Sequence, residues 1–377
     1  MDIPFNKPYL TGREGEGLAR AFENLRFAGD GPFTHRCSSV IAEWLQCERV
    51  LLTTSCTHAL EMAALLLDIQ PGDEVILPSF TFVSTANAFV LRGAKPVFVD
   101  SRPDTLNFDE QRFKELIGPR TRVAVPVHYA GVACEMDAIC EIAAAADIAV
   151  VEDNAHGFGG RYRGRPLGTF GCMAALSFHE TKNFSCGEGG ALVLNRPGLI
   201  QRAEIIREKG TDRSRFVRGE VDKYSWVDIG SSYCLGDLLA VFLLAQLDDR
   251  DVIQQRRKAI WEYYFASLQD LAAGNGVGLP VVPQHCEQAY HMFYLVARTS
   301  GERSSLIEHL RQRSIHAVFH YLPLHLSEMG RRFGGRQGQC PVAESISERL
   351  VRLPFFTAMT REEQEKVVSA VESFYAA

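Results

Sequence analysis

Short apolar runs alternate with amphipathic segments over the first half of the chain. The apolar runs predict strands at 49–54, 73–78, 95–100, 122–129 and 148–153. The segments between them predict helices at 57–69, 84–93, 109–117 and 136–147. Because the strands are apolar on both faces, we expect a mainly parallel sheet that helices cover. Strands at 174–178 and 191–195 bring the predicted sheet to seven strands.

The pattern changes after residue 195. A helix is predicted at 200–210, followed by a polar loop at 211–232 and a long helical stretch at 236–268 with a polar break at 248–251. The last predicted helix, 360–374, begins with the spacing of a capping box, Thr360 and Glu363. We therefore predict an α/β protein with a large domain, residues 1–250, and a smaller C-terminal α/β domain, residues 251–377.

Composition narrows the class of protein. The chain has 377 residues, of which 46% are hydrophobic and 23% charged, as expected of a soluble globular protein with two domains. A formal net charge of −6 argues against binding to nucleic acid or to an anionic membrane, both of which need a basic surface. No apolar run reaches the ~18 residues of a membrane span, and the first residues do not resemble a signal peptide.

The ten cysteines are scattered, and none forms a CxxC pair. This spacing is typical of free thiols in a reducing compartment, so we predict a cytoplasmic protein. It supports neither a zinc ribbon nor an iron–sulfur cluster, and no metal site is predicted.

One lysine, Lys182, lies between a predicted strand and a glycine-rich turn in the stretch SFHETKNFSCGEGG (177–190). A lone lysine near such a turn is usually a surface residue. Asp153 changes this interpretation, because it ends a predicted strand, where open α/β sheets carry ligand-binding groups. A buried carboxylate needs a partner, and a protonated pyridine nitrogen is a suitable one. An aspartate and a Schiff-base lysine on neighbouring strands are typical of a pyridoxal-phosphate site.

A phosphate needs a binding site of its own, and the stretch TTSCTHAL (53–60) offers one. It predicts a strand-to-helix turn of small hydroxyl residues, where unpaired amides and the helix dipole attract an anion. Ser55 or Thr57 can cap this helix with or without a ligand. Next to Asp153 and Lys182, phosphate binding is the favoured interpretation, and Ser177 can supply a further hydroxyl.

Six segments, in this order, resemble the sugar aminotransferases of the DegT/DnrJ/EryC1/StrS family: TTSCTHALEMA, PSFTFVSTANA, VPVHYAG, VEDNAHG, SFHETKNFSCGEGG and DIGSSY. The resemblance extends from the N-terminus into the C-terminal domain. It implies the fold-type I architecture of pyridoxal-phosphate-dependent enzymes and a homodimer with shared active sites. It also implies transfer of an amino group from L-glutamate to a nucleotide-linked keto sugar.

Within the family, VDKYSWVDIGSSY and AVFHYLPLH resemble a branch that aminates C4 of dTDP-4-keto-6-deoxyglucose. That branch serves the synthesis of surface polysaccharide such as lipopolysaccharide and enterobacterial common antigen. Two alternatives stay open. The enzyme can aminate another keto sugar, or at C3, or the chain can be a binding or regulatory homologue without activity. Lys182 favours amine transfer over the keto-sugar dehydratases of the family, in which a histidine replaces this lysine.

The resemblance also implies a role for each matching residue. Lys182 corresponds to the Schiff-base lysine and catalytic acid–base, and Asp153 to the partner of the ring nitrogen. The other expected cofactor contacts are Cys56, Thr57, Phe82, His156, Ser177 and Ser232. The expected substrate contacts are Phe33, Thr34, Lys223, His320, Tyr321 and His325, with Arg207 and Lys209 as further cations for the diphosphate.

The chain departs from the family pattern at a few of these positions. The frequent family motif GYNYR reads GSSYC here, so Ser232 replaces an asparagine that reaches the cofactor phosphate of the neighbouring subunit, and Cys234 replaces an arginine. The same GSSY is expected of the C4-aminating branch. Cys56 stands where the family often has glycine, so its backbone NH is the expected contact.

Overall fold

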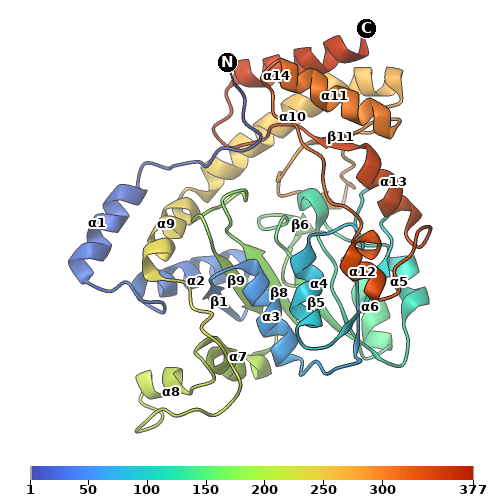
Figure 1. Ribbon diagram of the computed structural model, residues 1–377. Coiled ribbons are helices and arrows are strands. Elements are labelled where there is room, and N and C mark those ends of the chain that lie inside the picture. Colours follow the sequence, from blue (N-terminus) through green and yellow to red (C-terminus); the bar gives the residue numbers. More distant parts are fainter. Residues whose placement is uncertain (1, 377) are drawn as a thin grey trace.

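The computed structural model describes residues 2–376 and is centred on a seven-stranded sheet (Figure 1). The spatial order of the strands is β1 (Arg49–Thr53), β9 (Gly190–Leu194), β8 (Met173–Ser177), β5 (Ala149–Asp153), β4 (Thr121–Ala124), β2 (Glu74–Pro78) and β3 (Lys95–Val99). Neighbouring strands from β3 to β8 pair in parallel, whereas β9 is antiparallel to both β8 and β1. The mainly parallel sheet predicted from the sequence is confirmed.

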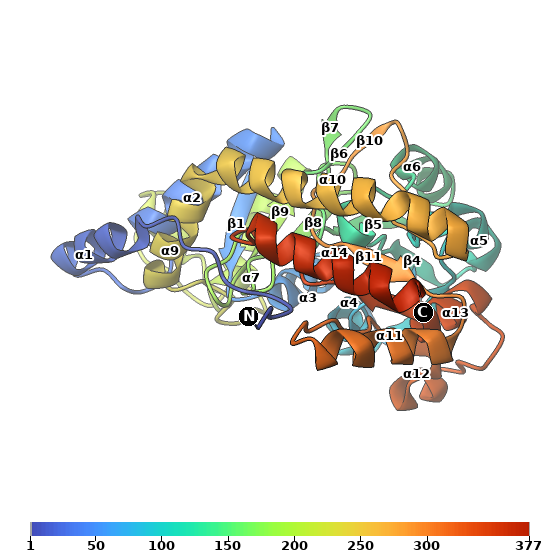
Figure 2. The same cartoon turned by 90° about the horizontal axis from the view of Figure 1, so that it is seen from above.

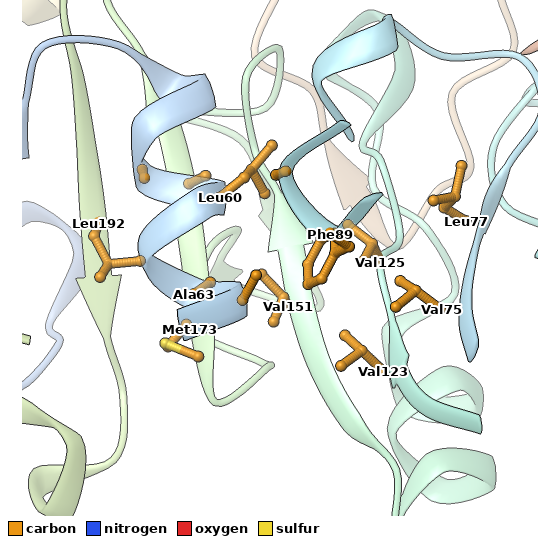
Figure 3. Close-up of a cluster of buried hydrophobic side chains, with 14 of the residues drawn as sticks. Leu60, Ala63, Val75, Leu77, Phe89, Val123, Val125, Val151, Met173 and Leu192 are labelled. Atoms are coloured by element: carbon orange, nitrogen blue, oxygen red, sulfur yellow. The ribbon is translucent and has the colours of Figure 1, made fainter. Parts of the chain in front are cut away.

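Helices cover both faces of this sheet, because its strands are apolar on both sides. On one face, α3 (Cys56–Leu66) and α4 (Val83–Val90) cover the sheet, in a cluster that contains Leu60 of α3, Phe89 of α4 and Val151 of β5 (Figure 3). The opposite face is covered by α2 (Pro32–Leu45), α9 (Asp237–Asp248), α5 (Glu110–Leu116) and α6 (Met136–Ala145). Each fully buried leucine or phenylalanine contributes about 1.5–3 kcal/mol to the stability of this arrangement.

A separate apolar cluster forms the core of the C-terminal unit. It joins α10 (Arg250–Asn275), α11 (Ser300–Gln312) and α14 (Arg361–Tyr375) to the two-stranded sheet of β11 (Tyr294–Val296) and β12 (Leu350–Arg352). Figure 2 shows α10 and α14 side by side. Ile3 belongs to the same cluster and bridges to Ile315, so the start of the chain packs on this unit. The division at residues 250 and 251 stays a prediction, and α10 begins there.

The remaining elements are short or peripheral. They are α1 (Glu14–Asn24), η1 (Tyr129–Gly131), β6 (Arg161–Tyr162), β7 (Arg165–Pro166), η2 (Pro197–Leu199), α7 (Ile200–Arg207), α8 (Arg213–Val217), β10 (Cys286–Glu287), η3 (Leu324–Leu326), α12 (Glu328–Arg332) and α13 (Pro341–Arg349). The predicted break at 248–251 is confirmed, since α9 ends at Asp248 and α10 begins at Arg250. The capping box of Thr360 and Glu363 is confirmed as well. No helix within residues 2–376 is long and apolar enough to cross a membrane.

Two segments differ from the sequence-based expectation. The predicted loop 211–232 contains the short helix α8. Phe33 and Thr34, expected to contact the substrate, lie in the first turn of α2, which begins at Pro32. A proline at the first helical position suits a helix start, and the carboxylate of Asp237 accepts hydrogen bonds from the amides of Phe33 and Thr34.

Candidate active site

A cavity of about 490 Å³ opens at the carboxyl ends of strands β5 and β8. Its first side combines these strand ends with the N-terminal turns of α3 and α4, and its second side comes from the C-terminal unit. The first side includes Ser55, Cys56, Thr57, Phe82, Ser84, Asp153, His156, Ser177 and Lys182, and the second His291, His320, Tyr321 and Arg352. Nine predicted site residues therefore meet in one cavity, at the usual ligand position of an open α/β sheet.

Lys182 lies in the turn that connects β8 to the antiparallel β9. The turn is closed by backbone hydrogen bonds from Lys182 N to His179 O (2.9 Å) and from Phe178 N to Gly189 O (2.8 Å). The amino group of Lys182 has no hydrogen bond or ion pair with any residue of 2–376. Burial lowers its pKa to about 8, although Cys56 and Asp153 oppose that shift. Lys182 is therefore an amine in the cavity that loses its proton unusually easily.

Asp153 is the last residue of β5, and its carboxylate is buried beside the cavity. One carboxylate oxygen accepts a hydrogen bond from the Thr85 hydroxyl (2.7 Å) and the other from the amide of Ala155 (3.2 Å). Burial raises the pKa of Asp153, whereas these hydrogen bonds and the charge of Lys182 oppose the rise. A buried carboxylate of this kind is stabilised by a cationic partner, and a protonated ring nitrogen is one.

The N-terminus of α3 forms one end of the cavity. The Ser55 hydroxyl caps this helix by accepting from the amide of His58 (3.1 Å). The amides of Cys56 and Thr57, in the first turn, have no partner inside the helix and are available to an anion. The Thr57 hydroxyl donates to Ser84 (2.8 Å), which lies in the first turn of α4. Capping and anion binding, the two alternatives for this turn, are therefore compatible, because Ser55 caps while the amides stay open.

Gly190, the first residue of β9 after the turn that carries Lys182, lets the start of α3 approach this strand. A Cβ atom on Gly190 would lie 2.3 Å from the carbonyl carbon of Ser55 and 2.4 Å from the amide nitrogen of Cys56. Real Cβ atoms do not approach backbone so closely, so any side chain at Gly190 would displace the turn. The absence of a side chain there brings the start of α3 and the lysine turn to the same cavity.

Stacked imidazole rings form the boundary with the C-terminal unit. The rings of His156 and His291 lie 4.3 Å apart at 18°, and the Tyr321 hydroxyl contacts Nε2 of His156 at 3.4 Å. Nδ1 of His156 is buried and has no hydrogen-bond partner within the described chain. Burial, with smaller effects from Lys182 and Arg352, holds the pKa of His156 well below its usual range. His156 is therefore a neutral ring with one nitrogen open to a ligand.

Hydrogen bonds from neighbouring residues hold His291 in its position in this stack. Nδ1 of His291 bonds the side-chain oxygen of Asn183 (3.0 Å), the residue after Lys182. The buried guanidinium of Arg257 donates to the carbonyl of His291 (2.6 Å). Tyr321 has φ of +21°, a conformation that costs a non-glycine residue about 1–3 kcal/mol and is typical of functional sites. Packing from both units thus holds these rings in place.

Some residues predicted to contact substrate are engaged elsewhere. The Thr34 hydroxyl donates to Asp237 (2.8 Å), in support of the start of α2. His325 is fully buried and bonds Ser79 (2.5 Å) and Glu344 (3.0 Å). Neither residue lines the cavity, and a substrate contact by either stays a prediction.

The other predicted residues outside the cavity lie around α2 and the segment 211–232. Phe33 packs in the core cluster of α2 and α9, and Arg207 pairs with Asp30 (2.5 Å). Lys209 pairs with Glu208 (3.0 Å). Lys223 and Ser232 are exposed to solvent. Within one chain, none of these side chains reaches the cavity, so their roles stay predictions.

The sequence analysis missed several residues at the site, among them Thr85, Phe5, His291 and Arg352. Thr85 was detectable, because it lies in the first turn of α4, the helix that follows strand β2 of the same sheet. Phe5, His291 and Arg352 had no such signal, since each lies outside the strand-and-helix pattern of residues 50–195. They are brought to the cavity by the packing of the C-terminal unit.

The arrangement fits pyridoxal phosphate. An amine without a partner, a buried carboxylate, an open imidazole nitrogen and a helix N-terminus surround one cavity. Asp153 would hold the ring nitrogen, the amides of Cys56 and Thr57 would hold the phosphate, and His156 would bond a polar ring substituent. Comparison with known proteins identifies the family, because the model of the DegT/DnrJ/EryC1/StrS aminotransferase family matches residues 10–372.

The chain belongs to this family. GDP-perosamine synthase of Escherichia coli O157:H7 is 29% identical over 377 residues, which cover 99% of this chain and 98% of the relative. DesV of S. venezuelae, solved in complex with a ketimine intermediate, is 32% identical with a TM-score of 0.90, over 100% of this chain and 99% of DesV. A putative sugar aminotransferase of Streptococcus pneumoniae, Spr1654 in its PMP form, is 26% identical with a TM-score of 0.92, over 100% and 99% of the two chains.

The protein is therefore a sugar aminotransferase of fold-type I with pyridoxal phosphate as cofactor. The bound cofactor supplies an electron sink for the carbon that gains or loses the amino group. The carboxylate of Asp153 would keep the ring nitrogen protonated. The amine of Lys182, with its lowered pKa, would carry the proton to and from that carbon.

Proposed function

We propose that this enzyme transfers the amino group of L-glutamate to C4 of dTDP-4-keto-6-deoxyglucose. The product is then dTDP-4-amino-4,6-dideoxygalactose, a precursor of surface polysaccharide, made in the cytoplasm. One observation carries the proposal: His320 and Tyr321, from the branch-like segment AVFHYLPLH, line the cavity that contains Lys182 and Asp153. The presence of Lys182 and Asp153 also argues against a homologue without catalytic activity.

We further propose that the enzyme works as a homodimer whose subunits share their active sites. Large apolar side chains are exposed on α1, at its C-cap and on the segment 211–232, at the side of the molecule that carries α1 and α8 (Figure 1): Phe22, Leu25, Phe216, Val217, Tyr224 and Trp226. Exposed apolar patches of this kind favour an interface. Lys223 and Ser232 lie on the same segment, so a second copy would bring them to the cavity of its partner.

A second candidate substrate is a GDP-linked keto sugar. It is favoured by the similarity to GDP-perosamine synthase, which extends over almost the whole of both chains. Amination at C3 is a third possibility, because a modest rotation of the sugar changes the carbon that meets the cofactor. All three substrates require the same cofactor side of the cavity.

A product assay by proton NMR tests the proposal. Holoenzyme is incubated with L-glutamate and, in separate samples, with dTDP-4-keto-6-deoxyglucose, the corresponding GDP-4-keto sugar and a dTDP-3-keto sugar. An amine at C4 of the dTDP sugar with a small H3–H4 coupling supports the proposal, because the galacto configuration places the amine axially. A large coupling, or conversion of another sugar in preference, contradicts it.

A further inference from the structure

Asn183, the residue after Lys182, has a buried side chain whose polar groups all have partners. Its NH₂ group donates to the carbonyl of Ala289 (2.6 Å) and to the side-chain oxygen of Gln254 (3.4 Å). Its oxygen contacts Nδ1 of His291 at 3.0 Å. Because a buried carboxamide keeps the orientation that satisfies its donors and its acceptor, these contacts join the turn of Lys182 to the C-terminal unit in one defined arrangement.

This arrangement decides which nitrogen of His291 carries the proton. The carbonyl of Ala289 is an acceptor, so the NH₂ group of Asn183 faces it and the oxygen of Asn183 faces His291. That oxygen is an acceptor as well, so Nδ1 of His291 must be the protonated nitrogen. The other ring nitrogen, Nε2, then carries a free lone pair, because a neutral imidazole has one donor and one acceptor.

The lone pair of Nε2 has no partner inside the described chain. The ring of His291 lines the cavity together with Lys182 and makes one hydrogen bond within residues 2–376, through Nδ1. Burial holds the pKa of His291 well below its usual range, and His156, Lys182, Arg257 and Arg352, which face the ring, add to this effect. The ring is therefore neutral, and Nε2 is a free hydrogen-bond acceptor at the cavity.

An acceptor at this place suits a ligand that brings a hydrogen-bond donor. Among the groups that line the cavity, Lys182 and Arg352 are donors, whereas Nε2 of His291 is an acceptor. A buried acceptor without a partner costs free energy, so a ligand that offers an OH or NH group is stabilised there. Both substrates of an aminotransferase for sugars have such groups, because an amino acid carries an ammonium group and a keto sugar carries hydroxyls.

We propose that Nε2 of His291 accepts a hydrogen bond from the substrate, and that Asn183 is the positioning residue that keeps this nitrogen unprotonated. The ring of His156, stacked on His291 at 4.3 Å, keeps the imidazole plane in place. The bound group is an OH or NH donor, either a hydroxyl of the keto sugar or the ammonium group of the amino donor. The proposal rests on the function proposed above for the identity of these two substrates.

Two substitutions of His291 separate the roles of its nitrogens. H291N places an NH₂ group near the position of Nδ1 and removes Nε2, whereas H291Q is long enough to place a carboxamide oxygen near the position of Nε2. Holoenzyme is mixed with L-glutamate, and pyridoxamine-loaded enzyme with dTDP-4-keto-6-deoxyglucose, in single turnovers followed by the cofactor spectrum. We expect H291N to weaken the apparent affinity in one half-reaction, by roughly two- to tenfold for a hydroxyl and roughly ten- to 100-fold for an ammonium group. H291Q should recover this loss to within about threefold of wild type.

The role of Asn183 is tested through the pH dependence. N183D presents a carboxylate to Nδ1, which favours the imidazolium and raises the pKa of His291. Below that pKa, Nε2 carries a proton and cannot accept a hydrogen bond. We therefore expect the substrate affinity of N183D, divided by that of wild type, to fall as the pH is lowered from about 8 to about 6, the range in which histidines usually titrate.

Nitrogen-15 NMR gives a readout that needs no turnover. In enzyme with labelled histidine, the signals of His291 are identified by their loss in H291N. We expect a protonated Nδ1 and a bare Nε2 in wild type, and a mixture of both tautomers in N183A, in which no acceptor faces Nδ1. Addition of the substrate that His291 binds should shift the Nε2 signal, because its lone pair then accepts a hydrogen bond.

H285N is the matched control, because His285 is a histidine of the same unit that pairs with Glu135 at 3.0 Å and does not line the cavity. It should leave both half-reactions unchanged. The cofactor affinity of H291N and N183D, measured by titration of the apoenzyme, should stay within about threefold of wild type, because the proposed hydrogen bond goes to the substrate.

Equal affinities of H291N and wild type in both half-reactions would exclude a substrate bond at Nε2. A loss that H291Q does not recover, or a loss of cofactor affinity, would show that the ring acts by packing on His156. A defect of N183D that is the same at every pH would overturn the role of Asn183 in setting the proton. Failure of wild type to aminate any nucleotide keto sugar would instead refute the proposed function, and the shift of Nε2 with each substrate would still decide the role of His291.

Discussion

The two sides of the cavity are built in different ways. On the sheet side, Asp153, Lys182 and the first turn of α3 follow directly from strand ends, and backbone hydrogen bonds fix their positions. On the side of the C-terminal unit, Arg352 and Tyr321 come from separate segments, and their side chains have few polar partners. The sheet side is therefore a rigid site for the invariant cofactor. The side formed by the C-terminal unit carries polar groups that are free to bind first the amino donor and then the keto sugar.

Replacement of Lys182 should have the largest effect and should stop both half-reactions. We expect K182A to lose turnover by more than about 10³-fold, since general acid–base catalysis alone contributes 10²–10⁴-fold. Thermal unfolding should change little, because the amine has no structural partner. The product assay measures the loss, and K258A, which changes an exposed lysine paired with Glu262, is the control. Repeated turnovers by K182A would contradict the assignment of the sheet side.

Asp153→Asn should lower the rate of amino transfer, because the cofactor ring then withdraws electrons less well, and the cofactor should still bind. We expect kcat to fall by on the order of 10²-fold, as when one positioned charged group is lost from an active site. Cofactor binding should persist, because the amides of α3 and the Lys182 amine remain. Comparison of kcat for several amino donors is the measurement. A loss confined to one donor would place Asp153 with the substrate side instead.

Gly190→Ala tests whether backbone packing holds the phosphate end of the site. The added Cβ would meet the backbone of Ser55 at 2.3 Å, so the start of α3 must move. We expect a loss of about 1–3 kcal/mol in the free energy of unfolding, as for overpacking elsewhere, and weaker cofactor binding. Gly198→Ala is the matched control, since nothing lies within 4 Å of its Cβ position. Equal behaviour of the two variants in a cofactor titration would refute this explanation.

The pH dependence of cofactor capture reports on Lys182. Only the neutral amine attacks the aldehyde of pyridoxal phosphate, and burial lowers the pKa of Lys182 to about 8. The rate at which the apoenzyme captures the cofactor should therefore rise with pH and level off above a midpoint near pH 8. Because the charge of Asp153 raises this pKa, D153N should move the midpoint to lower pH. Stopped-flow absorbance measures both curves, and a wild-type midpoint near 10 would show an ordinary, solvated lysine.

Tyr321→Phe should have the smallest effect, because it removes one long hydrogen bond to His156. A bond of this kind contributes about 0.5–1.5 kcal/mol, which predicts a change of roughly two- to tenfold. We expect that change in the sugar half-reaction, with cofactor affinity preserved. Separate titrations with cofactor and with nucleotide sugar measure it. A fall in cofactor affinity instead would mean that Tyr321 belongs to the sheet side.

The sequence by itself determined the sheet and the cofactor side of the site. Alternating apolar runs specify parallel strands, and the carboxyl ends of such strands meet at one edge, so Asp153 and Lys182 could be placed together before the fold was known. The capped turn at Ser55 could also be predicted from the sequence, because the residues at the start of a helix follow a local chemical pattern.

The tertiary structure alone decided the substrate side. Arg352, His291 and Phe5 come together only when the C-terminal unit and the first residues of the chain pack over the sheet. No periodicity marks such residues, because their contacts join segments far apart in the sequence. The same long-range packing placed Thr34 on Asp237 and His325 between Ser79 and Glu344, away from the cavity. Local patterns specify elements and their ends, whereas the partner of each side chain depends on how distant elements pack.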